Sequence, residues 1–139
     1  MGVVVVTALI ESIEDLYRVQ RGQLPDADVR RITADEALVD TGATGLALPR
    51  PMIDALGLMP IRARRMMTPS GVRDIPAFGA VRLTIGGREC VCDVIELANE
   101  CPVLIGQVSL ELMDFVVDPG RRKLIGNPAH NGEHLLELM

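Results

Sequence analysis

The sequence predicts a mostly β protein that forms a single domain. Many short apolar segments alternate with turn signals, which is typical of a β barrel or sandwich. The chain of 139 residues is long enough for one packed core and too short for two ordinary ones. Apolar residues make up 48% and aromatic residues only 2%, so aliphatic side chains must fill that core. A strand, a glycine and a short helix follow one another at 37–56 and again at 103–113, which suits two similar halves packed together.

In the first half of the chain, the β-branched run Val3–Ile10 predicts a strand buried on both faces. Ser12 then starts a helix, with Asp15 at the third position of a capping box and Gly22 as the stop. The next elements are a strand over 29–40, a short strand over 46–48, and a helix that Pro51 opens and Gly57 closes.

The second half reads as a series of hairpins. Segments 61–67 and 72–75 flank the turn signal Thr68–Gly71, and Gly86-Gly87 joins strands over 81–85 and 89–97. The apolar run 102–106 ends on glycine and precedes a helix over 109–113. Asp118-Pro119-Gly120 predicts a type II turn within a last hairpin, 115–125, and a polar tail follows residue 128.

Charge and cysteine content limit the partners. The net charge of −5 argues against a nucleic acid or an anionic membrane. Three cysteines are an odd number, and the apolar start over 1–10 is too short for a membrane span and lacks the basic residues of a signal peptide. The expectation is a soluble cytoplasmic protein with free thiols.

The most informative stretch is the apolar run 37–39 followed by Asp40, Thr41 and Gly42. It predicts a carboxylate held at the tip of a buried strand, where ionisation requires partners, with a glycine that lets the backbone turn. A plain turn cap would also explain this pattern. A phosphate-binding hairpin of the actin and sugar-kinase type needs two domains and a motif on the first strand, and a dehalogenase-like phosphatase needs a second Asp where Gly42 stands.

Asp40-Thr41-Gly42-Ala43 resembles the active-site motif of the retropepsin-type aspartic proteases. A hairpin around Ser70-Gly71 stands where that family has its flap, and Leu104-Ile105-Gly106 before a helix stands where it has the segment supporting the active-site loop. The three features occur in order over roughly 29–117. The chain is more similar to bacterial members of this clan than to viral enzymes.

The resemblance implies a single closed acid-protease β-barrel with short helices, forming one half of a two-fold homodimer. It implies an aspartic endopeptidase that needs no metal or organic cofactor and acts on peptides or proteins. The domain would span 1–128, with a polar tail over 129–139. The implied catalytic residues are Asp40, Thr41 and Gly42, and the implied substrate-binding residues are Ala43, Thr68, Ser70, Gly71 and Val72.

Two departures from the viral pattern leave the mode of dimerisation open. Residues 11–31 form an insertion, and the chain continues past the point where viral enzymes end. The alternative is therefore a catalytically inactive relative that binds peptides or dimerises without cutting.

Several other groups have simpler interpretations. Cys90 and Cys92 fall on the same side of a strand and are expected to be small buried residues, because a zinc site would lack ligands. His130 and His134 are expected in a solvated tail.

Charged and sulfur-containing residues surround the predicted flap. Arg62, Arg64 and Arg65 are expected on a solvated face, with a bias towards acidic peptides as the alternative. Asp93 is expected to pair with an arginine. Met66 and Met67 line a peptide groove or belong to the core.

Overall fold

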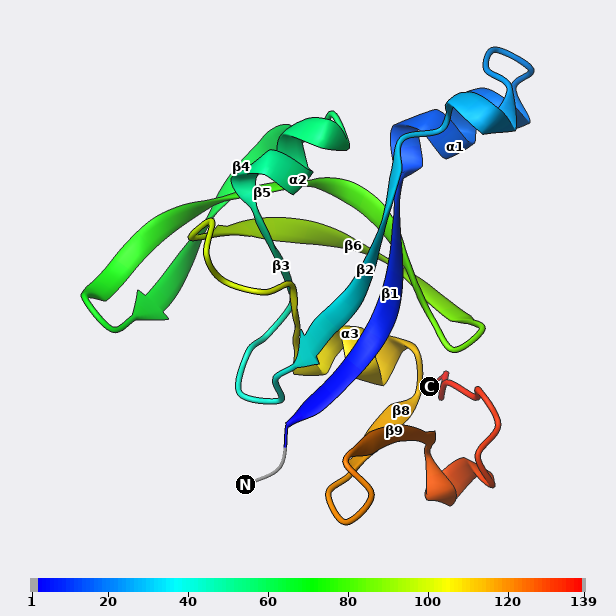
Figure 1. Cartoon of the computed structure of the whole chain (residues 1–139), viewed down its shortest axis with the longest axis vertical. Helices are drawn as coiled ribbons and strands as arrows, with labels where there is room; N and C mark the ends of the chain where they lie inside the picture. Colours follow the sequence, from blue (N-terminus) through cyan, green and yellow to red (C-terminus); the bar gives the residue numbers. More distant parts are fainter. Residues whose placement is uncertain (1–2, 139) are drawn as a thin grey trace.

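The computed structural model describes residues 3–138 and has a mostly β fold with short helices, as the sequence predicts (Figure 1). Seven strands form one sheet in the order β1-β2-β7-β3-β6-β5-β4, and β1 pairs with β5 as well as with β2. Strands β8 and β9 form a separate two-stranded sheet. The strands are β1 (Val4–Ser12), β2 (Arg31–Val39), β3 (Leu46–Pro49), β4 (Met59–Thr68), β5 (Gly71–Ile85), β6 (Arg88–Leu97), β7 (Leu104–Ile105), β8 (Phe115–Asp118) and β9 (Lys123–Gly126).

The helices are short and lie at the ends of strands. They are α1 (Ile13–Gln20), α2 (Arg50–Ala55) and α3 (Gln107–Leu112), with single 3-10 turns η1 (Asp26–Asp28) and η2 (Pro128–His130). Within residues 3–138, none is long and apolar enough to cross a membrane.

The expectation that the first strand is buried on both faces is wrong for its first half. Val4 is 5% exposed, but Val3 and Val5 are 59% and 50% exposed. This part of the chain pairs only with β2, whereas pairing with β5 begins at Leu9, so only the later residues are enclosed.

The insertion between β1 and β2 projects from the sheet as α1 and its following loop (Figure 1). Ser12 caps the helix by accepting a hydrogen bond from the Asp15 amide at 3.3 Å, as predicted. The Asp15 carboxylate does not complete the capping box. It accepts bonds of 2.8–2.9 Å from the amide and guanidinium of Arg30, which fasten the two ends of the insertion together.

The predicted hairpin around Thr68–Gly71 is present, and its second strand is longer than expected. The segments expected at 72–75 and 81–85 are parts of one 15-residue strand, β5. Pro76 does not interrupt it, because pairing with β6 starts only at Ala77, so one edge of β5 needs no amide donor at Pro76.

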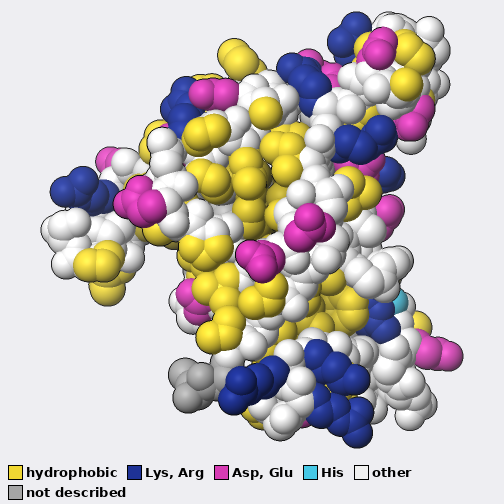
Figure 2. All heavy atoms as spheres, viewed as in Figure 1, with side chains coloured by type: hydrophobic (Ala, Val, Ile, Leu, Met, Phe, Trp, Pro, Cys, Tyr) yellow, Lys and Arg dark blue, Asp and Glu magenta, His cyan; other side chains and the backbone are white. Residues whose placement is uncertain are grey.

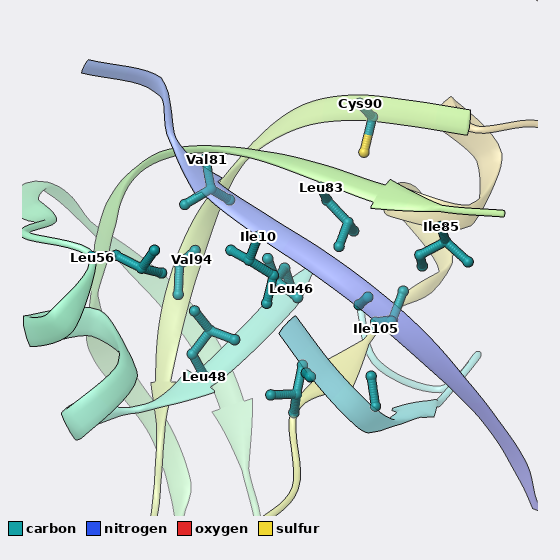
Figure 3. Packing of buried hydrophobic residues seen from close by; sticks show 14 of the residues in the cluster. Ile10, Leu46, Leu48, Leu56, Val81, Leu83, Ile85, Cys90, Val94 and Ile105 are labelled. Atoms are coloured by element: carbon teal, nitrogen blue, oxygen red, sulfur yellow. The ribbon is translucent and has the colours of Figure 1, made fainter. Parts of the chain in front are cut away.

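Side chains from β1, β3, β5, β6 and β7 converge in an aliphatic core (Figure 3). Ile10, Leu48 and Leu83 are fully buried there, and Cys90 belongs to the same cluster as the sequence predicts. Strand β6 is less enclosed than expected, since Val91 is 55% exposed.

The prediction of a type II turn at Asp118-Pro119-Gly120 is wrong, although β8 and β9 do form the predicted hairpin. The Asp118 carboxylate accepts bonds from the amides of Gly120 and Arg121, at 3.1 and 3.3 Å. Arg122 then takes the left-handed conformation, with φ 53°, so the reversal extends over four residues.

Part of the C-terminal tail is fastened to the end of α3. The Asp114 carboxylate contacts the His130 ring at 2.6 Å, the Asn127 amide group at 3.1 Å and the Leu135 amide at 3.1 Å. We call these contacts of Asp114 the C-terminal latch. The expectation of a solvated His130 is therefore wrong, because its side chain is only 20% exposed.

Candidate active site

Asp40 follows β2 directly and is held by its backbone. Its amide donates to the Ile105 carbonyl at 2.9 Å, and its carbonyl accepts from the Ala43 amide at 3.0 Å. One carboxylate oxygen, Oδ1, accepts from the Gly42 amide at 2.9 Å. A Cβ on residue 42 would lie 3.2 Å from that oxygen, so glycine permits the close approach. The Oδ2 atom has no hydrogen-bond donor within the described chain and remains available to a ligand.

The segment 104–106 supports this loop, as predicted. Strand β7 pairs with β2 in parallel, with Ile105 opposite Val39. Gly106 then packs against the loop so closely that a Cβ would lie 2.5 Å from the Thr44 carbonyl carbon. Figure 1 shows the loop between β2 and β3 next to α3.

Helix α3 binds the loop through its first free amides. Gly106, Gln107 and Val108 donate to the carbonyls of Gly45, Ala43 and Thr44 at 3.0, 2.9 and 2.9 Å. These amides have no partner within the helix, so the contacts satisfy both the helix end and the loop carbonyls. The Asp40 loop is thus rigidly positioned while Thr41 and Gly42 face solvent.

Two cavities flank the loop. One, of about 310 Å³, includes Asp40 and Thr41 and is closed on its far side by Val117, Pro119 and Arg122 of the β8–β9 hairpin. The other, of about 380 Å³, lies between the loop and the base of the β4–β5 hairpin. Its lining residues are Thr44, Gly45, Leu46, Arg64, Arg65, Met66, Cys92, Asp93, Ile95, Val108 and Ser109.

The β4–β5 hairpin has the form expected of a flap. Its tip is a two-residue turn, Pro69-Ser70, closed by a 2.7 Å bond from the Thr68 hydroxyl to the Gly71 carbonyl. Gly71 has φ +111°, a conformation that glycine adopts readily. Figure 1 shows the hairpin projecting from the body, and Figure 2 shows basic and hydrophobic side chains on this lobe, where Met67 and Val72 are 87% and 56% exposed.

The structure brings four of the eight sequence-predicted site residues together, namely Asp40, Thr41, Gly42 and Ala43. Thr68, Ser70, Gly71 and Val72 cluster separately at the flap tip, and none of them lines either cavity in the part of the chain described.

Sequence reasoning missed residues that line the cavities from distant segments. Arg122 borders the Asp40 cavity because of the turn conformation that the sequence did not indicate. Ser109 and Ile95 border the other cavity, and no local pattern marks them. The predicted pairing of Asp93 is confirmed, because its carboxylate binds Arg62 and Arg64.

The cysteine in the cavity wall is not an activated nucleophile. Hydrogen bonding to the Cys90 thiol, and then burial, raise the pKa of Cys92 well above its ordinary value. It therefore stays protonated at neutral pH. Across residues 3–138 no three His, Cys, Asp or Glu side chains gather in a way that could hold a metal ion.

The fold and site together define a class. The Asp40 carboxylate lies on a glycine-containing turn. The segment 104–106 and the start of α3 support that turn, and the β4–β5 hairpin projects from the same side of the molecule. This is the arrangement of the acid proteases.

The comparison with protein families agrees with that class. The family model for "Aspartyl protease" matches residues 28–108. The retroviral protease-like domain of Ddi1 from Leishmania major is 18% identical, with a TM-score of 0.50 over 89% of this chain and 87% of that one. The Simian foamy virus (mac) protease is 16% identical, with a TM-score of 0.48 over 77% of this chain and 91% of that one.

A retropepsin-like aspartic protease from Rickettsia conorii is 24% identical, with a TM-score of 0.41 over 63% of this chain and 68% of that one. No curated protein matches the chain. Because the family model covers more than half of its residues, the chain belongs to the retropepsin-like aspartyl protease family.

Proposed function

We propose that the chain is an aspartic endopeptidase that hydrolyses peptide bonds as a homodimer. The observation that carries this proposal is the geometry of Asp40, whose Oδ1 is held by the Gly42 amide while Oδ2 points to no donor in the described chain. In the dimer, Asp40 of each chain would lie beside the other on the two-fold axis.

Two adjacent carboxylates supply the chemistry of peptide hydrolysis. Like charges a few Å apart cannot both ionise without a large electrostatic penalty, so one carboxyl keeps its proton. The ionised carboxylate takes a proton from the attacking water, and the protonated carboxyl donates to the substrate carbonyl oxygen, which gives a tetrahedral intermediate. As the C–N bond breaks, the carboxyl that took the water proton gives it to the leaving amine, and the other carboxylate takes back a proton from the intermediate's hydroxyl as the carbonyl re-forms. The two groups titrate as a coupled pair. Thr41 and Gly42 would position the two loops against each other.

The surface around Asp40 is suited to a second copy. Thr41 is exposed, as are Val3, just before β1, and Val5, the second residue of that strand, where Val4 pairs with Val39 beside the loop. Burial of such apolar surface favours association. The pairing of β1 with both β2 and β5 supports a closed barrel for each half.

Substrate would be an extended peptide that lies between the loops and the flaps. We propose that Ala43 contacts it from the loop and that Thr68, Ser70, Gly71 and Val72 contact it from the flap tip after closure. No metal or organic cofactor enters this mechanism. The proposed domain covers 1–128, with 129–139 as its tail. Free thiols at all three cysteines suit a cytoplasmic location.

The test is cleavage of a broad peptide library by the chain and by Asp40→Asn. The substitution keeps the shape of the side chain and removes its acid–base function, so cleavage should fall by about 10²–10⁴-fold or more. Circular dichroism and sedimentation should be unchanged. Asp35→Asn, on the exposed face of β2, is the matched control and should cleave normally.

The competing function is a peptide-binding or dimerisation module without catalysis. A chain that binds peptides, and that hydrolyses none of them before or after the Asp40 substitution, would establish that alternative and contradict the endopeptidase.

A further inference from the structure

The 380 Å³ cavity between the active-site loop and the base of the flap is large enough for one substrate side chain. It lies four to six residues beyond Asp40 on the same loop, at Thr44 to Leu46, and is bounded on the opposite side by Arg64 and Met66 of β4. A peptide bound between the loop and the flap would pass its opening. The cavity is therefore placed to select one residue of the substrate.

Most of its wall is apolar. Leu46, Met66, Ile95 and Val108 come from four different elements and line it together. Such a wall favours the methylene groups of a side chain over water. A purely aliphatic side chain would satisfy these residues, but it would leave the surplus positive charge of the wall without a counter-charge.

That charged part carries an excess of positive charge. Asp93 accepts through a single oxygen, Oδ2, from Arg64 at 2.5 and 3.2 Å and from Arg62 at 3.4 Å. Two guanidinium groups thus share one carboxylate. The residues opposite Arg62 and Arg64 on β5 are Ala77 and Ile75, which add no negative charge.

The remaining acid of the hairpin lies elsewhere. Asp74 is opposite Arg65 in the hairpin, but only Arg65 of that pair lines the cavity, where it adds a further positive charge. The Arg64 side chain is still 41% exposed despite its contact with Asp93, so a ligand can reach it. A carboxylate bound here would neutralise the surplus charge and gain charge-assisted hydrogen bonds from guanidinium donors.

We propose that this cavity is a specificity subsite for an acidic substrate side chain, and that it selects glutamate. The apolar wall holds the two methylene groups, and Arg64, assisted by Arg62, binds the carboxylate. Aspartate has one methylene fewer and reaches the guanidinium less well from the same backbone position. The proposal rests on the proposed function, because it assigns the peptide class that the Asp40 site would cut.

The test compares residues enriched in cleaved members of an equimolar peptide library. For the unmodified chain we expect glutamate to be enriched at one fixed position relative to the scissile bond. For a matched pair of peptides that differ only as Glu against Gln at that position, kcat/KM should differ by about tenfold, the factor expected for one charge-assisted contact. Arg64→Met, which keeps the stem and removes the charge, should bring the ratio close to unity.

Two further variants separate a local contact from a general charge effect. Asp93→Asn frees both guanidinium groups, so it should raise the Glu-to-Gln ratio, opposite to Arg64→Met. Arg21→Gln removes one positive charge, as Arg64→Met does, but on the exposed loop after α1. It should leave the Glu-to-Gln ratio unchanged. Enrichment of an apolar residue at every position, or a ratio that Arg64→Met does not alter, would overturn the proposal.

A second readout does not depend on catalysis. The Asp40→Asn chain is used to retain peptides from the same library, and retained peptides are sequenced. Glutamate enrichment among the retained peptides, if Arg64→Met abolishes it, supports the subsite. It does so even if the unmodified chain cuts no peptide, in which case only the endopeptidase fails. Cleavage without glutamate enrichment keeps the endopeptidase and overturns the subsite.

Discussion

At the scale of single residues, Gly106 is the position where the loop that carries Asp40 leaves no room for a side chain. A Cβ there would lie 2.5–2.7 Å from backbone atoms of residues 43–45, and backbone cannot rotate away as a flexible side chain can. A Cβ added to Gly45, on the other side of the same contact, would point into open space. A methyl side chain therefore fits at residue 45 and does not fit at residue 106, although the two glycines are in contact.

We expect Gly106→Ala to lower the free energy of unfolding by about 1–3 kcal/mol, the usual effect of overpacking a tight contact. It should also reduce peptide cleavage, because the loop must shift to accept the methyl group. Gly45→Ala is the matched control and should stay within about 0.5 kcal/mol of the unmodified chain. Urea unfolding of both variants makes the comparison, and equal stabilities would contradict the close contact.

Residues whose chemistry is local were predictable at this scale. The Asp40 turn could be recognised because its geometry depends on adjacent residues, whereas Gly106 was recognised through the family resemblance, since its contacts are with residues 43–45. Arg122 beside Asp40 could not be recognised, since it reaches that cavity only because its own backbone is left-handed. The pairing of Asp93 was expected, but its sharing between two arginines depends on the register of β4 against β5 and β6.

At the scale of elements, the C-terminal latch couples the tail to α3 through two titratable groups. The hydrogen bond from His130, together with those from Leu135 and Asn127, lowers the pKa of Asp114 to about 2. The same contact with Asp114 raises the pKa of His130 above its ordinary value of 6.5. At pH values between these two pKa values, Asp114 is ionised and His130 is protonated, so the C-terminal latch contains an ion pair.

The pH dependence follows from the directions of these shifts. A raised His130 pKa contributes stability that is complete below about pH 6.5 and is lost as pH rises through the higher folded value. A lowered Asp114 pKa contributes stability that is present above pH 3.8 and is lost as pH falls towards 2. We therefore expect the tail to be held best between about pH 4 and pH 6.5.

Amide hydrogen exchange of residues 131–138 measures this opening, after correction for the intrinsic effect of pH on exchange. Protection should decrease as pH rises above the folded pKa of His130. His130→Ala should remove that dependence. His134→Ala should retain it, because the hydrogen bond that His134 makes within residues 3–138 is to the Leu112 carbonyl, at 3.0 Å. A tail equally protected from pH 5 to pH 9, or an equal effect of both substitutions, would contradict the latch.

The order and type of elements were predictable because they depend on local apolar patterns and turn residues. The exceptions have a common cause, which is the identity of the neighbouring strand. The start of β1 is exposed because β5 does not reach it, and β5 continues through Pro76 because β6 begins only afterwards. The latch joins residues 13 to 21 positions apart across a loop, and no periodicity marks such a contact.

At the scale of the whole molecule, the proposed reaction uses two aspartates, of which each chain would supply one. The loop is already rigid in a single chain, since β7 and the first turn of α3 bind it from one side. For the proposed reaction one chain would lack the second carboxylate, and the exposed Thr41 and Gly42 leave that side of the loop open. The proposed activity should therefore belong to the dimer and should depend on the composition of both halves.

Mixing the unmodified chain with Asp40→Asn tests this at constant total concentration. If each active site needs Asp40 from both chains, and if subunits exchange freely, activity should fall as the square of the unmodified fraction. If each chain acts alone, activity should fall linearly. The mixture is equilibrated before the assay, and sedimentation verifies that the proportion of dimer does not change. Asp35→Asn, mixed in the same way, should leave activity constant because both of its halves keep Asp40. A linear decrease with Asp40→Asn would overturn the shared site, and a quadratic decrease would place one catalytic carboxylate in each chain.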